Sequence, residues 1–405
     1  MQSSQFLPVI ESLATGTPGN LVRQTDAAKF LANLKGLEKN QHRIEKIYEH
    51  TRIDTRHLAI NLLTEETVAL RELLCETVNF SREKGTIEQR MQMYEKYGLP
   101  LAEDVTRRVL LAASEQQKKH NPLSTEKIED SIGLIVFVTS TGFVAPGIDA
   151  QLIKSLGLRR NIARVPVNFM GCAAAMNGLR VACDHVKANP EHKALVICLE
   201  LSSINAVFQD DLNDIIIHSI FGDGCAAVVI GAYEPEQIQG RGKFIIRDNF
   251  SYLAENTEDG ITLGIRDNGI TCLLSRQLPD YIESGVGRII TNFLNSHEIT
   301  KEDIDLWMVH PGGTKIIEKV QLSLDLNDEQ VADSWGVLRQ YGNLLSCAIL
   351  FVMERMILRL EQGCGTQALK PNKSGVTRKN AAALTGLAFS FAPGVGIEGI
   401  LLEKI

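Results

Sequence analysis

The chain of 405 residues is long enough for about two or three domains, or for one large duplicated unit with a buried core. Hydrophobic residues make up 44% and charged residues 22%, which excludes a disordered or fibrous chain. The net charge of -7 provides no basic field for a polyanion, so nucleic acid is not expected as a partner. No apolar run approaches the ~18 residues of a membrane span. The N-terminus also lacks the features of a secretory signal, so we expect a cytoplasmic protein.

The pattern of the chain changes near residue 130. Before it, segments such as 83–96 and 102–113 are charged and helical in pattern, and we expect them to form a solvated outer layer. After it, apolar runs alternate with helical segments rich in small residues. The runs typical of buried strands are Gly133–Thr139, Ala194–Leu199, Ala226–Gly231, Leu306–His310 and Leu384–Phe389. Buried strands separated by helices predict a layered α/β sandwich.

The eight cysteines include no C-x-x-C pair, which excludes zinc ribbons and thioredoxin-like motifs. Most lie among apolar residues and are interpreted as small buried side chains in a reducing compartment. Cys172 differs, because it lies where a predicted strand ends and a predicted helix begins. A helix N-terminus lowers the pKa of a thiol, so Cys172 is the candidate thiolate. The alternative is a packed cysteine at a tight turn.

Two segments of the chain repeat one spacing. A predicted strand ends at Thr139 and a helix begins at Cys172, while a second strand ends at His310 and a helix begins at Asn343. Both intervals are 33 positions (172 − 139 and 343 − 310). The repeat predicts two copies of one strand–loop–helix unit, 171 positions apart, whose pseudo-symmetry would bring Cys172 and Asn343 to one crevice.

His310 ends a predicted buried strand and opens a glycine-rich turn, and it is therefore the candidate catalytic histidine. The alternative is a structural imidazole bonded to backbone. A thiolate stabilised by imidazolium can take an acyl group, and the imidazole and the Asn343 amide can then donate to a thioester oxygen that becomes an enolate. A carboxylate in place of Asn343 would repel that oxyanion. The residue set therefore favours carbon–carbon bond formation over hydrolysis.

Short stretches around these residues form a specific pattern: Ala14–Gly19, Thr139–Gly147, Asn168–Ala174, Phe221–Ala227, His310–Gly313, Tyr341–Asn343 and Phe391–Gly394. In them the chain resembles the type III polyketide synthases, the chalcone synthase-like enzymes of the thiolase fold. The resemblance implies an α/β fold, a duplicated αβαβα layered sandwich with pseudo-twofold internal symmetry. Its N-terminal half, residues 1–240, would carry Cys172, and its C-terminal half, residues 241–405, would carry His310 and Asn343.

The resemblance also implies an activity. Such enzymes load an acyl group from coenzyme A onto the cysteine, decarboxylate malonyl-CoA to an acetyl enolate, extend the chain repeatedly and cyclise it. They use no metal and no other cofactor, since acyl-CoA and malonyl-CoA are substrates, and they act as homodimers. We also consider acyl donation by a carrier protein.

The resemblance places the substrate cavity at Phe221, Cys272, Asn205, Leu345, Leu263, Pro393 and Gly394. Phe221 matches one of the family's two gatekeeper phenylalanines, whereas the second falls on Cys272, which opens space. Leu345, Asn205 and Leu263 replace other residues of plant members, and Ala145 replaces a methionine that reaches into the partner subunit, so a flavonoid product is not expected. The region 91–113 is similar to bacterial members, many of which use fatty acyl starters and form alkylresorcinols or alkylpyrones. The alternative is a repacked cavity of ordinary volume.

Arg52, Arg56 and Lys315 are the candidate cations for the nucleotide end of coenzyme A. The run Gly394–Gly399 matches G-x-G-x-x-G, but no helix or acidic residue follows at the required distance, so we interpret it as a turn and a strand. Two rival functions stay open. One is an enzyme similar to ketoacyl synthase III that condenses once onto a malonyl carrier protein, and the other is a non-catalytic acyl-CoA-binding member of the fold.

Overall fold

A mixed sheet of nine strands runs through the computed structural model, which describes residues 6–34, 37–60, 86–206, 211–267, 269–362 and 383–405. Within these residues the strand order is β11-β12-β13-β8-β1-β7-β6-β4-β5. The strands are β1 (Leu7–Gly16), β4 (Ile132–Thr139), β5 (Ala163–Asn168), β6 (Lys193–Leu201), β7 (Asp223–Tyr233), β8 (Phe244–Leu253), β11 (Leu306–Val309), β12 (Thr385–Ala392) and β13 (Gly396–Lys404). Two antiparallel pairs lie outside this sheet: β2 (Asn20–Arg23) with β3 (Thr55–Leu58), and the hairpin of β9 (Ile261–Arg266) with β10 (Gly269–Leu274).

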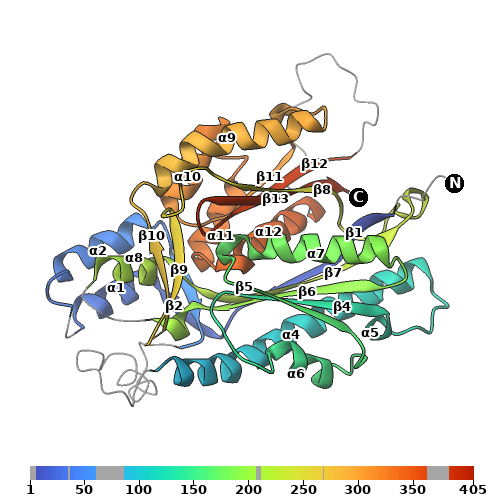
Figure 1. Ribbon diagram of the computed structural model, residues 1–405, viewed down its shortest axis with the longest axis horizontal. Coiled ribbons are helices and arrows are strands. Elements are labelled where there is room, and N and C mark those ends of the chain that lie inside the picture. Colours follow the sequence, from blue (N-terminus) through green and yellow to red (C-terminus); the bar gives the residue numbers. More distant parts are fainter. Residues whose placement is uncertain (1–5, 35–36, 61–85, 207–210, 268, 363–382) are drawn as a thin grey trace.

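Helices separate and cover the two parts of this sheet. They are α1 (Gln24–Ala32), α2 (Gln41–His50), α4 (Ile87–His120), α5 (Ile128–Ser131), α6 (Ile148–Ser155), α7 (Ala174–Ala188), α8 (Leu212–Ile220), α9 (Leu278–Ser296), α10 (Thr314–Leu324), α11 (Ala332–Tyr341) and α12 (Ala348–Glu361). Figure 1 shows α4 and α6 below the lower strands, α7 and α12 between the two sets of strands, and α9 and α10 above the upper set. The layers are therefore αβαβα, as predicted.

The strand order repeats itself in the two parts of the sheet. The series β1, β7, β6, β4 is antiparallel, antiparallel and then parallel, and the series β8, β13, β12, β11 has the same directions. In each series a buried helix, α7 or α12, precedes the third strand along the chain. The predicted duplication is confirmed by this topology. The two series meet where β1 pairs with β8 through Val9 and Ile10.

One detail of the predicted repeat is wrong. A 3₁₀ turn, η3 (Gly171–Ala173), opens α7, and Cys172 lies within it. The equivalent turn, η7 (Leu345–Cys347), opens α12, so Asn343 lies two residues before its helix and not at the helix start. Asn343 is instead held in an isolated parallel β-bridge with Phe221. The reason is backbone geometry, since Gly342 and Leu345 both have positive φ and turn the chain before the helix begins.

The expectation of a solvated layer before residue 130 is also wrong. β1 lies in the middle of the nine-stranded sheet, with Val9 and Ile10 fully buried. The long helix α4 begins at a capping box formed by Thr86 and Gln89, and it buries Tyr94 against the sheet. Most charged residues of α4 lie on one face of the helix, and the opposite face packs in the core. The charge pattern alone therefore did not indicate that α4 is a core element.

Three apolar clusters fill the spaces between the layers. Alternate residues of β4 point to opposite faces, so Ile135 and Phe137 join the cluster under α4, while Val136 and Val138 join the cluster around α7 and α12. A third cluster, which includes Trp307, lies between the upper strands and α9 and α10. None of the helices described is both long enough and apolar enough to cross a membrane.

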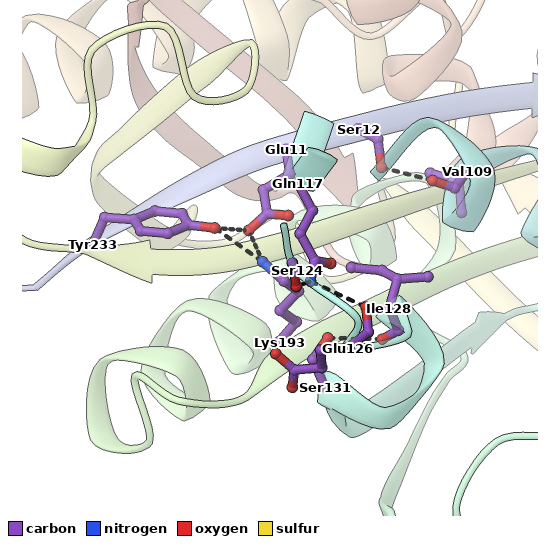
Figure 2. A network of polar contacts seen from close by, with 10 residues as sticks. All are labelled: Glu11, Ser12, Val109, Gln117, Ser124, Glu126, Ile128, Ser131, Lys193 and Tyr233. Atoms are coloured by element: carbon purple, nitrogen blue, oxygen red, sulfur yellow. Dashed lines mark hydrogen bonds and ion pairs between the residues drawn. The ribbon is translucent and has the colours of Figure 1, made fainter. Parts of the chain in front are cut away.

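A polar network closes one end of the lower strands (Figure 2). Lys193, the first residue of β6, forms a buried ion pair with Glu11 of β1, and the Tyr233 hydroxyl donates to the same carboxylate. Because both charges are largely buried, each needs the other as a partner. Glu200 lies near the other end of β6. The network therefore fixes three strands at the end of the sheet away from Glu200.

We predict that Gly178→Val destabilises the fold. A Cβ at this position of α7 would lie 2.9 Å from Val138 Cγ2, so the larger side chain would force α7 away from β4. The expected loss is about 1–3 kcal/mol of unfolding free energy in urea titrations, the usual cost of overpacking. Gly285→Val is the matched control, since a Cβ there has Ile289 Cδ1 as its nearest neighbour at 3.9 Å. Equal stability of the two variants would contradict the packing argument.

Candidate active site

Cys172 and Asn343 meet where the two halves of the fold come together. The Asn343 Nδ2 atom lies 3.8 Å from Cys172 Sγ, and Nδ2 also donates to the Gly312 carbonyl at 3.1 Å. The Leu345 backbone N–H donates to Asn343 Oδ1 at 2.8 Å, which fixes the amide orientation because a backbone N–H cannot accept. The amide therefore presents an N–H donor towards the sulfur. The predicted meeting of these two residues is confirmed.

His310 follows β11, as predicted, and its ring is buried beside Gly312. A Cβ on Gly312 would lie 3.3 Å from His310 Nε2, so the glycine is needed for this close approach. The Gly312 carbonyl accepts the hydrogen bond from the Asn343 amide, so the His310 imidazole and the Asn343 amide are neighbours. Neither ring nitrogen of His310 has a hydrogen-bond partner within the described residues. Buried polar atoms without partners are uncommon, so both ring nitrogens of His310 are free to bond to a molecule bound beside them.

The expected lowering of the Cys172 pKa is wrong for the substrate-free protein. Burial raises the pKa of the Cys172 thiol, and the neighbouring Cys272 adds to the effect, while the Asn343 amide opposes it. Burial also lowers the pKa of His310 to about 3. Loss of hydration outweighs the effect of the short turn at the start of α7, so both shifts favour the neutral forms, a thiol at Cys172 and an uncharged imidazole at His310.

Glu200 is a buried acidic residue that is connected to the site by hydrogen bonds. Glu200 on β6 is fully buried and accepts hydrogen bonds from the Ser140 N–H, the Thr141 hydroxyl and the Ser346 hydroxyl. Burial raises the pKa of Glu200 to about 7 even though these donors favour the ionised form. The Ser140 hydroxyl in turn accepts from the Gly171 N–H beside Cys172. Glu200 thus connects the loop after β4 to the start of α12.

Four predicted cavity residues surround Cys172. Phe221, Cys272 and Leu345 form one buried apolar cluster, and Cys172 and Leu263 pack against it. Cys272 and Leu263 are paired across the β9–β10 hairpin, so their side chains share one face of it. The hairpin therefore forms a wall of the site.

The other predicted cavity residues lie at its edges. Asn205 donates from Nδ2 to the Thr141 carbonyl at 2.7 Å, and its Oδ1 accepts from the Ile270 N–H at 3.2 Å. Pro393 packs on the turn before Cys172, since a Cβ on Gly171 would lie 3.3 Å from Pro393 Cδ. Gly394 has a φ of 70° and donates its N–H to the Ile261 carbonyl. The turn therefore closes the site wall, and β13 follows it as a strand.

An apolar cavity opens beside this wall and extends under α1 and α2. Phe221, Cys272 and Leu345 line its end near Cys172. Its lining further away is mostly aliphatic and aromatic, with Val22, Ala27, Phe30, Leu31 and Leu58.

Two of the three candidate cations lie at the surface. Arg52 and Lys315 both form ion pairs with Glu318, and Arg52 also stacks over Trp335. Their side chains are 59% and 71% exposed, so they are open to solvent near the turn after His310.

The third candidate cation, Arg56, differs from the other two because it is buried in the wall of the cavity. Its side chain is only 3% exposed, and its guanidinium donates to Gln24 and to the carbonyls of His218 and Phe221. Those contacts hold it inside the fold. Arg56 is close in sequence to the exposed Arg52, but it is buried because alternate side chains of β3 point inwards.

Several residues of the site were missed from the sequence: Glu200, Ser140, Thr141, Ser346, Gln24 and the buried role of Arg56. A signal existed for Glu200, since it is the acidic residue inside the apolar run 194–201. An acid in a buried strand needs donors, and therefore marks a polar cluster. Nothing in the sequence around Ser140, Thr141 and Ser346 marks their hydroxyl groups in this way.

The duplicated αβαβα sandwich, with a thiol, an imidazole and an amide at the junction of its halves, defines the class of thiolase-fold acyltransferases. The family models agree. Residues 1–235 match the N-terminal domain, and residues 249–405 the C-terminal domain, of chalcone and stilbene synthases. The chain therefore belongs to the type III polyketide synthases, transferases that catalyse decarboxylative condensation.

Individual relatives support this assignment. The chain is 45% identical over 397 residues to the alpha-pyrone synthesis polyketide synthase-like Pks18 of Mycobacterium tuberculosis, covering 98% of this chain and 91% of that protein. It is 28% identical over 359 residues to 1,3,6,8-tetrahydroxynaphthalene synthase of Streptomyces peucetius, covering 88% and 87%. The crystal structure of PKS-I from the brown alga Ectocarpus siliculosus aligns over the whole of both chains, with a TM-score of 0.84 and 39% identity.

We predict that Glu200→Gln reduces the pH dependence of stability. The Glu200 pKa is raised from 4.5 to about 7, so between these values the folded protein keeps a proton that the unfolded chain has lost. Stability from this group is therefore present at low pH and lost as pH rises. Between pH 5 and 8 the wild-type unfolding free energy should fall by roughly 2–3 kcal/mol more than that of the variant. Identical pH profiles from denaturant titrations would contradict the raised pKa.

Proposed function

We propose that this polyketide synthase uses Cys172 as its nucleophile and His310 and Asn343 as its donors, and that it extends a fatty acyl starter. The observation that carries the proposal is the apolar lining of the cavity, whose near end shares Phe221, Cys272 and Leu345 with the packing around Cys172. Burying each methylene group of an acyl chain there favours binding by about 0.8 kcal/mol.

In the loading step, Cys172 Sγ attacks the carbonyl carbon of acyl-CoA. His310 is neutral and buried, so it can take the thiol proton and pass it to the departing coenzyme A thiolate. The new bond joins sulfur to the acyl carbon, and the bond from that carbon to the coenzyme A sulfur breaks. A neutral starting pair suits this step, since no charge is buried until substrate enters.

In the extension step, malonyl-CoA loses carbon dioxide and leaves an acetyl-CoA enolate. The His310 and Asn343 N–H groups donate to its oxygen, and the fixed Asn343 amide already presents one donor towards the sulfur. The enolate carbon attacks the Cys172 thioester, a carbon–carbon bond forms, and the Cys172 thiolate leaves. Repetition and ring closure complete the product.

We propose an alkylpyrone or an alkylresorcinol as that product. The name of the mycobacterial relative refers to alpha-pyrone synthesis, which supports the pyrone. Coenzyme A esters serve as donors in this scheme, with Arg52 and Lys315 available for the nucleotide end and a carrier protein as an alternative acyl donor. Mass spectrometry of products from malonyl-CoA and a series of acyl-CoA starters tests the scheme. One malonyl unit per product would instead favour the single-condensation alternative.

We further propose a homodimer in the cytoplasm. β5 forms one edge of the nine-stranded sheet, and none of its six residues is buried. An exposed edge strand in a protein of this size is a template for pairing with a second strand. A second copy of the chain would cover it.

We predict that Cys172→Ala abolishes polyketide formation, because no other group would carry the acyl chain. Circular dichroism and sedimentation should show an unchanged fold and assembly. Cys183→Ala is the matched control, since it removes a buried thiol from the same helix, and it should keep product formation. Undiminished product from Cys172→Ala would remove the proposed nucleophile.

We predict that Cys272→Phe shifts starter preference towards shorter acyl chains. Cys272 lines the cavity beside Phe221, so an aromatic ring there would narrow the entrance. Leu273→Phe is the matched control, because this neighbour lies on the other face of β10 and is 45% exposed. The ratio of kcat/KM for long and short starters is the measurement. Unchanged chain-length selectivity in Cys272→Phe would refute the role of this cavity.

A further inference from the structure

The helix α8 ends directly at the site, and its last carbonyl groups accept hydrogen bonds from distant parts of the chain. An α-helix leaves its last carbonyl groups without partners inside the helix. In α8 these are the carbonyls of His218, Ser219 and Ile220, and the cap residue Phe221 follows. Phe221 lines the cavity and forms the bridge with Asn343. The way these carbonyls are bonded therefore sets the position of two site residues.

These three carbonyls, and the carbonyl of Phe221, each accept a hydrogen bond from another part of the chain. Arg56 Nη1 donates to the carbonyls of His218, at 2.5 Å, and Phe221, at 2.8 Å. Gln24 Nε2 donates to the Ser219 carbonyl at 2.7 Å. The Ile220 carbonyl accepts from the Asn343 backbone N–H at 2.9 Å. The helix end is thus closed by two side chains and by the backbone of Asn343.

The two side chains also hold each other. Arg56 Nε donates to Gln24 Oε1 at 2.9 Å, and Gln24 Nε2 donates to the Thr51 hydroxyl at 3.0 Å. Both are almost fully buried, Gln24 at 4% exposed and Arg56 at 3%. A cation at a helix C-terminus is stabilised by the partial negative charge of the carbonyls. Burial lowers the pKa of Arg56, and Tyr48 and the buried Asp223 offset part of that effect. The guanidinium therefore depends on protein partners, and Arg56 also belongs to the lining of the cavity.

The backbone of Asn343 is adapted to this arrangement. Gly342 has a φ of 71°, and a Cβ there would lie 2.5 Å from the Ile220 carbonyl oxygen and 3.0 Å from Arg56 Cδ. The Arg56 side chain thus packs directly on the residue before Asn343. The Gly222 N–H donates to the Asn343 carbonyl at 3.0 Å and completes the bridge.

We propose that Arg56 and Gln24 are positioning residues for the condensation, which set the Phe221–Asn343 bridge relative to Cys172. This inference rests on the proposed function. Loss of the Arg56 guanidinium would leave two carbonyls without their donor, and α8 and Phe221 would move. The Asn343 amide would then be displaced from the enolate oxygen. A displacement of about 1 Å in a catalytic group costs up to ~100-fold in rate.

The test compares Arg56→Met, Arg56→Lys and Gln24→Leu with the wild type in steady-state kinetics with malonyl-CoA and a fatty acyl-CoA starter. We expect kcat to fall about 10- to 100-fold in the Arg56 variants and less in Gln24→Leu, with the KM for malonyl-CoA within about twofold of wild type. Intact-protein mass spectrometry should show that acyl loading of Cys172 persists while extension slows. A purely structural defect would not separate these two steps.

Two controls define the outcome. Thr55→Ala alters the half-buried neighbour of Arg56 on β3, whose hydroxyl donates to the Gln340 carbonyl, and should keep wild-type kinetics. Arg52→Ala should raise the KM for malonyl-CoA with little change in kcat. If the Arg56 variants behave like Arg52→Ala, Arg56 binds coenzyme A and the inference is overturned. If the Arg56 variants do not fold, the Gln24→Leu variant decides the outcome, and wild-type kinetics in that variant would overturn the inference. Absence of polyketide from the wild type would instead contradict the proposed function.

Discussion

The backbone pairing of Phe221 with Asn343 joins the two halves of the molecule at the point where the chemistry is placed. Phe221 comes from the N-terminal series of strands and helices, and Asn343 from the C-terminal one. The pairing puts the end of α8 against the turn before α12, and the same turn carries the amide that faces Cys172. The cavity wall and the proposed donor to the substrate oxygen, the Asn343 amide, therefore depend on one short set of hydrogen bonds. The buried contacts of Arg56 and Gln24 hold that set from behind.

Desolvation dominates the electrostatics of the site. It raises the pKa values of Cys172 and Glu200 and lowers that of His310, so the substrate-free site keeps these groups close to neutral. Charge would then arise only as the reaction proceeds, where the amide and imidazole donors are already in place. The same apolar surroundings that suppress charge also favour an acyl chain. One physical property, exclusion of water, thus serves both catalysis and substrate selection in the proposed scheme.

Much of the fold could be predicted because its strands are short apolar runs buried on both faces, as in β4 and β6. β1 was missed, since its serine and glutamate residues interrupt the apolar pattern, and the partners of Glu11 are distant in sequence. The meeting of Cys172 with Asn343 could be predicted from a repeated spacing. The buried role of Arg56 could not, because an arginine has the same appearance in a sequence whether it faces solvent or caps a helix from inside.

Residue types and their spacing along the chain were enough to predict the candidate reactive groups, the duplicated order of strands and helices, and the family. Tertiary structure alone decided the ionisation of Cys172 and His310, the orientation of the Asn343 amide, the extent of the apolar cavity and the partners of Arg56. The physical reason is the same in each case. Burial and hydrogen-bond direction are properties of neighbours in space, and these neighbours lie up to about 300 positions apart in the chain, as with Arg56 and Gly342.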